Sequence, residues 1–201
     1  MLVTQKFETI GEMSCNPSMG GIGKGTLIRE IDALGGLMGE LADQSAIQFK
    51  VLNQSKGAAV QGPRAQIDRD QYLRKMQEMF TTKKPENLNV HLGSVFDLII
   101  ENGECKGLVL EDGTRLRSEA VVITAGTFLK GKCYIGKDEV VPAGRHLRLQ
   151  PGYEAASIGL AESLERFGFP KARLKTGTPP RLDGRTIDYS QLQVERGDSD
   201  I

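Results

Sequence analysis

Residues 14–26 read Ser-Cys-Asn-Pro-Ser-Met-Gly-Gly-Ile-Gly-Lys-Gly-Thr, and a helical pattern of apolar residues begins where they end. Glycine lets backbone N–H groups come close to a ligand and adopts positive φ without a steric cost. A glycine run that opens a helix also presents unpaired N–H donors at the positive end of the helix dipole, which suits an anion such as phosphate. The stretch therefore predicts a backbone cradle for a phosphorylated cofactor, with the thiol of Cys15 beside it.

Two well-known phosphate-binding motifs do not account for this stretch. A nucleoside-triphosphate P-loop needs a glycine five residues before Gly23, where the sequence has Ser18. It also needs a Ser or Thr directly after Lys24, where the sequence has Gly25. The dinucleotide fingerprint needs three glycines at a spacing that Gly20, Gly23 and Gly25 do not have. On glycine content alone, a tight structural turn explains the stretch equally well.

Read as a whole, the stretch resembles the cysteine-containing glycine loop of the MnmG/GidA family of flavoenzymes. Further stretches match that family in its own order and at similar spacing: residues 29–37, 56–66, 124–129 and 173–181. Together the matches cover almost the whole chain. The resemblance implies FAD-dependent modification of the wobble uridine of certain tRNAs, which receives a carboxymethylaminomethyl group or, in mitochondria, a taurinomethyl group.

The resemblance implies an α/β fold, namely an incomplete FAD/NAD(P)-binding Rossmann-like domain with a small β-meander insertion. Residues 1–201 are expected to form a partial FAD-binding domain that lacks the N-terminal GxGxxG unit. Residues 182–201 are expected to begin a further segment with poor order. On this expectation the chain is a fragment that also lacks the C-terminal part of the family, so binding of FAD by the chain alone is left open.

The resemblance also implies roles for particular residues. Cys15 takes the position of a family cysteine that lies near the flavin and is implicated in catalysis. A nearby helix N-terminus and Lys24 would favour its thiolate form. Contacts to FAD are expected from Gly20, Gly21, Gly23, Lys24, Gly25, Val95, Thr124, Ala125, Gly126 and Ser157. Positions near the substrate or the flavin are expected for Arg64, Lys175 and Arg181, with solvated surface charge as the equal alternative.

The other expected roles have structural alternatives as well. A lone cysteine is more often a small buried residue, and Cys105 and Cys133 are interpreted in that way. Val95 is expected to use its main chain, so a core position for its side chain is compatible with the role. Ser157 serves equally as the N-cap of the helix that follows it. Residues 124–126 let the backbone approach a diphosphate or simply close a β-turn.

The implied reaction links a one-carbon unit and glycine, or taurine, to the uridine, with NADH able to reduce the flavin. Implied partners are tRNA, an MnmE-type GTPase and a second copy of the full-length protein. Alternatives are another FAD-dependent oxidoreductase or folate-dependent tRNA methyltransferase of the same fold, and a truncated, non-catalytic product. A eukaryotic source implies a mitochondrial location and a bacterial one a cytoplasmic location; residues 15–18 and 64–69 favour the former.

Composition narrows the classes further. The 201 residues carry a formal net charge of +0, so no overall positive field attracts nucleic acid, and RNA contact would need a local patch. The three cysteines are not closely paired, which argues against a disulfide framework and a zinc site. No apolar run is long enough to span a membrane. Aromatic residues make up 5% and Trp is absent, which disfavours a stacking platform for single-stranded RNA.

Hydrophobic periodicity predicts the remaining elements. Helices are expected over 26–37, 64–80 and 157–167, and strands over 1–4, 47–52, 88–100, 107–110 and 120–123. Asp112 and Gly113 predict a hairpin turn, so that the strands around them form a small β-meander. On the second helix, Arg69, Arg74 and Lys75 are interpreted as a solvated face rather than as a nucleic-acid surface.

Overall fold

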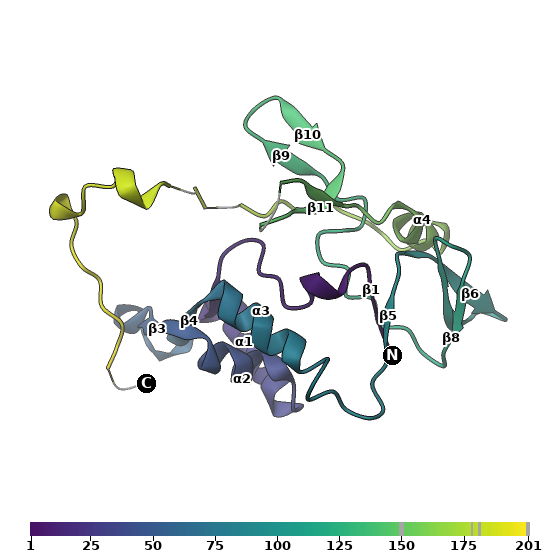
Figure 1. The fold of residues 1–201 in the computed structure, drawn as a ribbon, viewed down its shortest axis with the longest axis horizontal. Helices are drawn as coiled ribbons and strands as arrows, with labels where there is room; N and C mark the ends of the chain where they lie inside the picture. The colour runs from purple at the N-terminus through teal and green to yellow at the C-terminus, as the bar shows by residue number, and fades with distance from the viewer. Residues whose placement is uncertain (149–150, 178, 181, 200–201) are drawn as a thin grey trace. The chain divides into compact units, whose positions relative to one another are not determined.

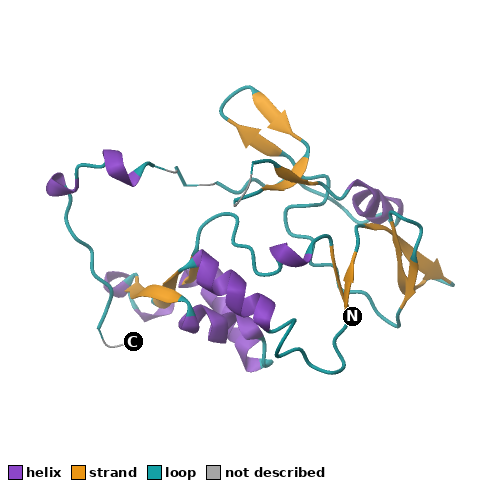
Figure 2. Cartoon of the chain, viewed as in Figure 1, coloured by secondary structure: helices purple, strands orange, loops and turns teal. Residues whose placement is uncertain are grey.

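The computed structural model describes residues 1–148, 151–177, 179–180 and 182–199. Its contacts divide the chain into two compact units. Unit 1 comprises Met1–Glu8 and Pro85–Lys175, and unit 2 comprises Thr9–Lys84 and Thr176–Ile201. Each unit has its own helices and small sheets, and each is described by itself (Figure 1, Figure 2).

Unit 2 is built on a three-stranded antiparallel sheet whose central strand is β4. The strand order is β2 (Ser18–Gly20), β4 (Gly62–Ile67) and β3 (Ala46–Leu52). Three helices lie together with this sheet in Figure 1: α1 (Gly21–Ala33), α2 (Leu37–Gln44) and α3 (Arg69–Glu78). Because α1 follows β2 directly, the edge of the sheet sets where the helix begins.

The core of unit 2 forms where the sheet meets α2 and α3. Ile67 of β4 is 2% exposed, and burial of such a side chain stabilises the fold by about 1.5–3 kcal/mol. From α1, Ile28 reaches this core only as a partly buried residue. The α1 helix therefore lies at the margin of the core. The buried members of the cluster are Met19, Leu41, Ala42, Ala65, Ile67 and Tyr72.

The structure corrects the helix predicted over residues 64–80. Its first part is the strand β4, which pairs with β2 on one side and β3 on the other. The helix α3 begins at Arg69, where the carboxylate of Asp68 accepts hydrogen bonds from the amides of Asp70 (3.0 Å) and Gln71 (2.9 Å). Two-sided pairing of a central strand outweighs the helical spacing of its apolar residues, because it satisfies the strand's backbone groups.

Two further predictions in unit 2 change. The first helix begins at Gly21 rather than at residue 26, so part of the glycine motif is helical. On α3, Arg69 is not simply solvated, because its guanidinium donates a hydrogen bond to the carbonyl of Cys15. Arg74 is exposed, as predicted, and Lys75 donates to the side chain of Gln44 (3.3 Å). The strand predicted over 47–52 is confirmed as β3.

The last described stretch of unit 2 lies along the outer edge of β3. The amide of Asp198 donates to the carbonyl of Phe49 (2.9 Å), and the carboxylate of Asp198 accepts from the amide of Val51 (2.8 Å). Upstream, Glu195 forms an ion pair with Lys50. These contacts occupy backbone groups of β3 that a neighbouring strand would otherwise use.

Unit 1 contains the predicted β-meander. Three antiparallel strands follow one another: β6 (Val95–Glu101), β7 (Glu104–Leu110) and β8 (Arg115–Arg117). The predicted turn between β7 and β8 is confirmed, since the carboxylate of Asp112 accepts a hydrogen bond from the amide of Thr114 (2.8 Å). The helix α4 (Ile158–Arg166) packs against β6 and agrees with the helix predicted over 157–167.

The remaining strands of unit 1 form two-stranded pairs. β1 (Leu2–Thr4) pairs in parallel with β5 (Val90–Leu92), whereas β9 (Cys133–Ile135) with β10 (Glu139–Val141) and β11 (Ala143–His146) with β12 (Tyr153–Ala155) are antiparallel. The strand predicted over 1–4 is thus confirmed. Short 3₁₀ helices in the chain are Phe7–Thr9, Gln54–Lys56, Ala58–Val60, Gly184–Thr186 and Tyr189–Gln191.

Two strand predictions in unit 1 are corrected. The strand predicted over 88–100 is interrupted between β5 and β6, where the amide of Gly93 donates to the carbonyl of Thr4 (2.9 Å). Residues 120–123 do not form the predicted buried strand, and Val122 is 85% exposed. An extended segment becomes a strand only by pairing, and none of the strands in the described ranges pairs with these residues.

Candidate functional site

The glycine motif passes from β2 into α1. Gly20, the N-cap of α1, has φ 115°, a region that residues with a Cβ rarely adopt. A Cβ at this position would lie 2.8 Å from the Cα of Arg64 and would overlap the carbonyl oxygen of Pro63. Packing within unit 2 therefore requires glycine here, whatever the motif binds.

The first turn of α1 supplies the donors that the sequence predicted, but from fewer residues. By helix geometry the amides of Gly21, Ile22 and Gly23 have no acceptor within the helix, and they lie at the positive end of its dipole. A Cβ added to Gly23 would meet no atom within 4 Å, so this turn faces open space. The amides of Lys24 and Gly25 fall within the helical ladder and are not part of the cradle.

The thiol and the lysine of the motif have separate surroundings. Cys15 is exposed, and its carbonyl is held by the guanidinium of Arg69. The ammonium of Lys24 donates to the carbonyl of Ser18 (2.9 Å), which ties the first turn of α1 back to β2. The strand β2 lies between Cys15 and the N-terminus of α1 in the chain. Lys24 therefore has a structural role that its predicted cofactor contact did not include.

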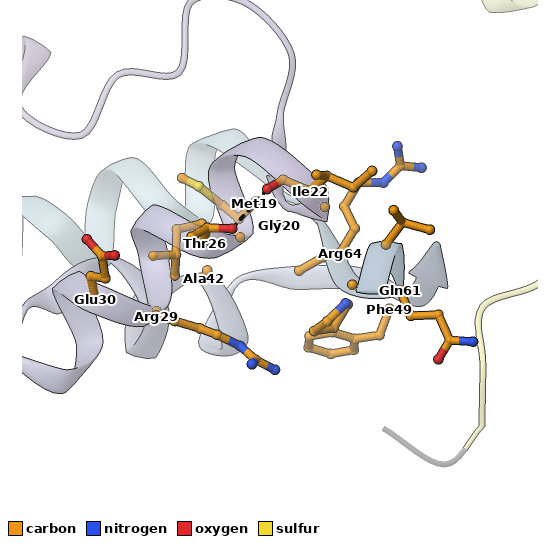
Figure 3. A pocket seen from close by; sticks show the side chains of 18 of the residues that line it. Met19, Gly20, Ile22, Thr26, Arg29, Glu30, Ala42, Phe49, Gln61 and Arg64 are labelled. Carbon is orange, nitrogen blue, oxygen red and sulfur yellow. Dashed lines mark hydrogen bonds between the residues drawn. The ribbon is translucent and has the colours of Figure 1, made fainter. Parts of the chain in front are cut away.

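A pocket of about 680 Å³ opens in unit 2 between α1, α2 and the β3–β4 hairpin (Figure 3). Sequence reasoning missed most of its lining residues, among them Arg29, Asp43 and Phe49. Figure 3 shows the side chain of Arg29 extending from α1 toward the part of the pocket where Phe49 lies. Ile22 and Arg29 are seven residues apart, a spacing that places both on the same face of a helix. This spacing could have predicted that both line one pocket. Of the predicted residues, the pocket is lined by Gly20, Gly21, Gly25 and Arg64 and not by Gly23 or Lys24.

In unit 1, the predicted Thr-Ala-Gly corner is a turn. Gly126 has φ 55°, and the amide of Phe128 donates to the carbonyl of Ala125 (3.0 Å). The carbonyl of Phe128 in turn accepts from the amide of Ser157 (2.8 Å). The structure thus brings Ser157 against the segment that follows the corner. Thr124 is exposed at its start.

Ser157 precedes α4 as its N-cap residue, but its hydroxyl makes no capping hydrogen bond. Ser157 is only 9% exposed, and its carbonyl accepts a hydrogen bond from the amide of Lys130 (3.1 Å). The predicted position at the helix start is confirmed. The predicted alternative, a hydroxyl used only for capping, does not describe this geometry.

The helix α4 is fixed on β6 next to Val95. A Cβ added to Gly159 would overlap the ring of Phe96 and lie 2.7 Å from its carbonyl oxygen, so the first turn of α4 touches this residue directly. The carboxylate of Asp97 accepts hydrogen bonds from the hydroxyl of Ser163 (2.5 Å) and the guanidinium of Arg166 (2.7 Å). The spacing between the start of β6 and the start of α4 is therefore set by direct contacts.

These contacts also change the charge behaviour of Asp97. Burial raises the pKa of the Asp97 carboxyl, but the hydrogen bonds from Ser163 and the Leu98 amide and the charge of Arg166 outweigh it. The pKa lies below its ordinary value, and the carboxylate stays ionised at neutral pH.

A buried ion pair lies next to the corner in unit 1. Glu154 of β12 is 2% exposed and accepts a hydrogen bond from Nε of Arg145 on β11 through Oε2. The guanidinium of Arg145 lies over the ring of Phe128, 5.2 Å from its centroid. No described residue donates a hydrogen bond to the other oxygen of Glu154, Oε1, although it is buried. Sequence reasoning missed this pair because no local pattern marks it.

The remaining predicted residues are placed as follows. Val95 is partly buried at the first position of β6, opposite Leu110. Lys175 is exposed, and Arg181 lies outside the described residues. Within the described ranges, no three His, Cys, Asp or Glu side chains are grouped so that they could hold a metal ion. No helix there has the length and apolar character needed to cross a lipid bilayer.

Comparison with solved structures identifies a protein with a similar fold. The mixed α/β chain is similar to Aquifex aeolicus GidA in its form I crystal, with a TM-score of 0.85 and 48% sequence identity. The similarity covers 98% of this chain and 31% of that one.

The sequence comparisons give the family. The profile described as Glucose inhibited division protein A matches residues 1–201, and the chain belongs to this family, which confirms the resemblance seen in the sequence. The chain is 50% identical over 201 residues to the tRNA uridine 5-carboxymethylaminomethyl modification enzyme MnmG of Granulibacter bethesdensis, covering 98% of this chain and 30% of the relative. It is 49% identical over 191 residues to the MnmG of Aquifex aeolicus, covering 95% and 30%. The chain thus spans about 30% of the length of these relatives.

Proposed function

We propose that this chain is part of an FAD-dependent enzyme that adds a carboxymethylaminomethyl or taurinomethyl group to the wobble uridine of tRNA. The observation that carries the proposal is the family match over residues 1–201, together with about half of the residues identical to two MnmG enzymes. The proposal includes a partial FAD-binding, Rossmann-like domain across the chain. It also includes residues 182–201 as the beginning of a further segment.

The residues present fit a flavin dinucleotide. In unit 2, the free amides at the start of α1 suit a phosphate, and Gly23 leaves room beside them. Arg64 is one of the residues that line the neighbouring pocket, and its positive charge favours an anionic group there. In unit 1, a Cβ added to Gly126 would meet no atom within 4 Å, so the diphosphate or sugar atoms of a ligand can approach that turn.

The proposed division of roles follows from these positions. FAD, when bound, supplies the redox chemistry. Val95 would offer its main chain to the adenine edge, and Ser157 and the corner at Gly126 would hold the neighbouring part of the cofactor. Cys15 is the proposed catalytic thiol, since it is exposed and able to meet a substrate. Lys175 and Arg181 are proposed to lie near the flavin or the substrate.

Flavin binding by the purified chain is the first test. Titration of FAD into the protein, followed by quenching of flavin fluorescence, is expected to show saturable binding. A matched titration with riboflavin is expected to bind more weakly, because it lacks the phosphates and the adenine that the proposed contacts recognise. Absence of FAD binding would count against the cofactor assignment and would favour a non-catalytic product.

The second test addresses the reaction. In cells that lack the gene, nucleoside mass spectrometry of tRNA is expected to show loss of the modified wobble uridine. Restoring the gene with Cys15→Ser is expected to leave the modification absent while flavin remains bound. Cys105→Ser, at a half-buried cysteine of β7, is the matched control and is expected to restore modification. Normal modification with Cys15→Ser would remove Cys15 from the catalytic role, and normal modification without the gene would favour another flavoenzyme function.

Partners and location belong to the same proposal. Transfer RNA, NADH as reductant, an MnmE-type GTPase and a second copy of the full-length protein are the proposed partners. The two relatives described above are bacterial, which supports the cytoplasmic alternative; a mitochondrial location applies if the source is eukaryotic. Co-purification of a GTPase with the tagged protein from its own source would test the partnership.

A further inference from the structure

The carboxylate of Glu154 has one oxygen that the described chain leaves unused. The side chain is 1% exposed, and Oε2 accepts a hydrogen bond from Nε of Arg145. Oε1 is buried, and it has no donor among the described residues. A buried polar atom without a partner destabilises a fold, and the penalty is larger for a charged group. A carboxylate retained in this state implies a donor that comes from elsewhere.

The surroundings of Glu154 hold this oxygen in one place. Arg145 is itself fixed, because its guanidinium lies over the ring of Phe128. Gly144, which precedes Arg145, lies so close to the same ring that an added Cβ would overlap it. The carbonyl of Gly144 accepts a hydrogen bond from the hydroxyl of Thr127 (2.7 Å). The ion pair is therefore built into packed backbone rather than attached to a mobile loop.

This packed group adjoins two of the proposed cofactor contacts. Phe128 donates its amide to the carbonyl of Ala125 and accepts from the amide of Ser157, at 3.0 Å and 2.8 Å. Glu154 also precedes Ser157 closely in the chain, since β12 leads into α4. The unused oxygen thus belongs to the same small region of unit 1 as the corner at residues 124–126.

We propose that Oε1 of Glu154 accepts a hydrogen bond from a sugar or ribityl hydroxyl of the dinucleotide. The inference rests on the proposed FAD-binding function and adds a specific residue to it. A carboxylate accepts hydrogen bonds and repels a diphosphate, and FAD carries no cationic donor, so the partner of Oε1 within FAD is a neutral donor. Hydroxyl groups are the neutral donors that the ribose and the ribityl chain of FAD supply. Arg145 binds Oε2, which leaves Oε1 as the oxygen that can accept from the ligand.

The experiment measures recognition of single hydroxyl groups. FAD and FAD analogues that each lack one ribose or ribityl hydroxyl are titrated into the purified chain. One analogue is expected to bind about tenfold more weakly than FAD, as for loss of a hydrogen bond to a charged acceptor. In Glu154→Gln, the amide oxygen faces Arg145 and the NH₂ group takes the position of Oε1. This variant is expected to lose most of the tenfold discrimination, because its NH₂ group cannot accept from the hydroxyl and can only donate to it in a weaker, neutral hydrogen bond.

Control variants separate this effect from general damage. Glu139→Gln makes the same change on exposed strand β10 and is expected to keep the tenfold discrimination. Thermal unfolding followed by circular dichroism reports whether Glu154→Gln is folded. If it is not, Arg145→Lys replaces it, because a lysine keeps the charge but fixes the carboxylate less firmly. Discrimination is expected to fall in that variant as well.

Each outcome decides the proposal. Equal binding of FAD and every analogue by the unaltered chain overturns it and indicates that a buried water serves Oε1. Undiminished discrimination in Glu154→Gln, or in Arg145→Lys when that variant replaces it, also overturns it. Failure of the unaltered chain to bind FAD at all overturns the proposed function and this inference together. Discrimination that is lost only with the altered ion pair supports it.

Discussion

The helices α1 and α4 both begin at proposed cofactor contacts, but the chain holds them in different ways. In α4, Leu160, Ala161 and Ser163 are buried and Gly159 touches β6. All residues of α1 lie in the described chain and stay partly or fully exposed, with Leu27 at 61%. At the start of α1, Gly20 packs tightly against β4 and Lys24 donates to Ser18. The start of α4 is thus fixed along a buried face, whereas the start of α1 is fixed through its N-cap and one lysine.

The largest effect is expected at the N-cap of α1, Gly20. Gly20→Ala places a Cβ against the backbone of β4 and forces a positive φ on alanine. Because neither backbone can yield without breaking the sheet, the free energy of unfolding is expected to fall by about 3 kcal/mol. Urea unfolding followed by circular dichroism measures the change. Unchanged stability would show that α1 is not anchored through Gly20.

A somewhat smaller loss is expected at the start of α4. Gly159→Ala would press a methyl group onto Phe96, whose ring can move but whose carbonyl cannot. We expect the free energy of unfolding to fall by about 2 kcal/mol, in the same denaturation experiment. Gly168 cannot serve as the control, because its φ of 75° disfavours alanine. Ala161→Gly is used instead, since it changes α4 without adding volume. A neutral Gly159→Ala would remove the claim that α4 is held by close contact.

The Asp97 contacts make the hold on α4 dependent on pH. The pKa of Asp97 is lowered in the folded protein, so its stabilising contribution is present above the unfolded pKa of about 4 and is lost as pH falls through the folded pKa. Asp97→Asn is expected to cost about 1 kcal/mol at neutral pH and progressively less in acid. Stability curves of both proteins measured against pH test this. A constant difference at all pH values would contradict the expected role of the charge.

The smallest effect has the opposite sign. Gly23→Ala adds a methyl group where no atom lies within 4 Å and removes a glycine from a helix, so stability is expected to rise by about 0.5 kcal/mol. FAD binding is expected to weaken, because the methyl group occupies the space beside the free amides of α1. Paired unfolding and FAD titrations check both results. Higher stability with unaltered FAD binding would show that the start of α1 does not contact the cofactor.

Local signals predicted the parts of the fold that depend on local physics. The turn at Asp112 follows from its own side-chain hydrogen bond, and Ser157 stands at the start of α4 as its sequence position indicated. Failures occurred where distant pairing decides. Residues 64–67 have helical spacing but lie in the central strand β4, and residues 120–123 have strand character but lack a described partner.

The candidate site shows the same division. The glycine motif indicated a helix N-terminus correctly in kind, but the helix begins at Gly21 because β2 ends against β4. The role of Lys24 as a donor to Ser18 depends on how that strand meets the helix. Glu154 and Arg145 could not be paired in advance, because strand register rather than sequence spacing brings them together.

The stretch that lies along β3 limits where this protein can be truncated. Asp198 occupies the amide of Val51 and the carbonyl of Phe49. Shortening the chain before Glu195 would uncover a row of hydrogen-bonding groups on an apolar strand, which is a template for aggregation between molecules. Insoluble protein after such a truncation would therefore reflect an opened sheet edge and not a defective cofactor site.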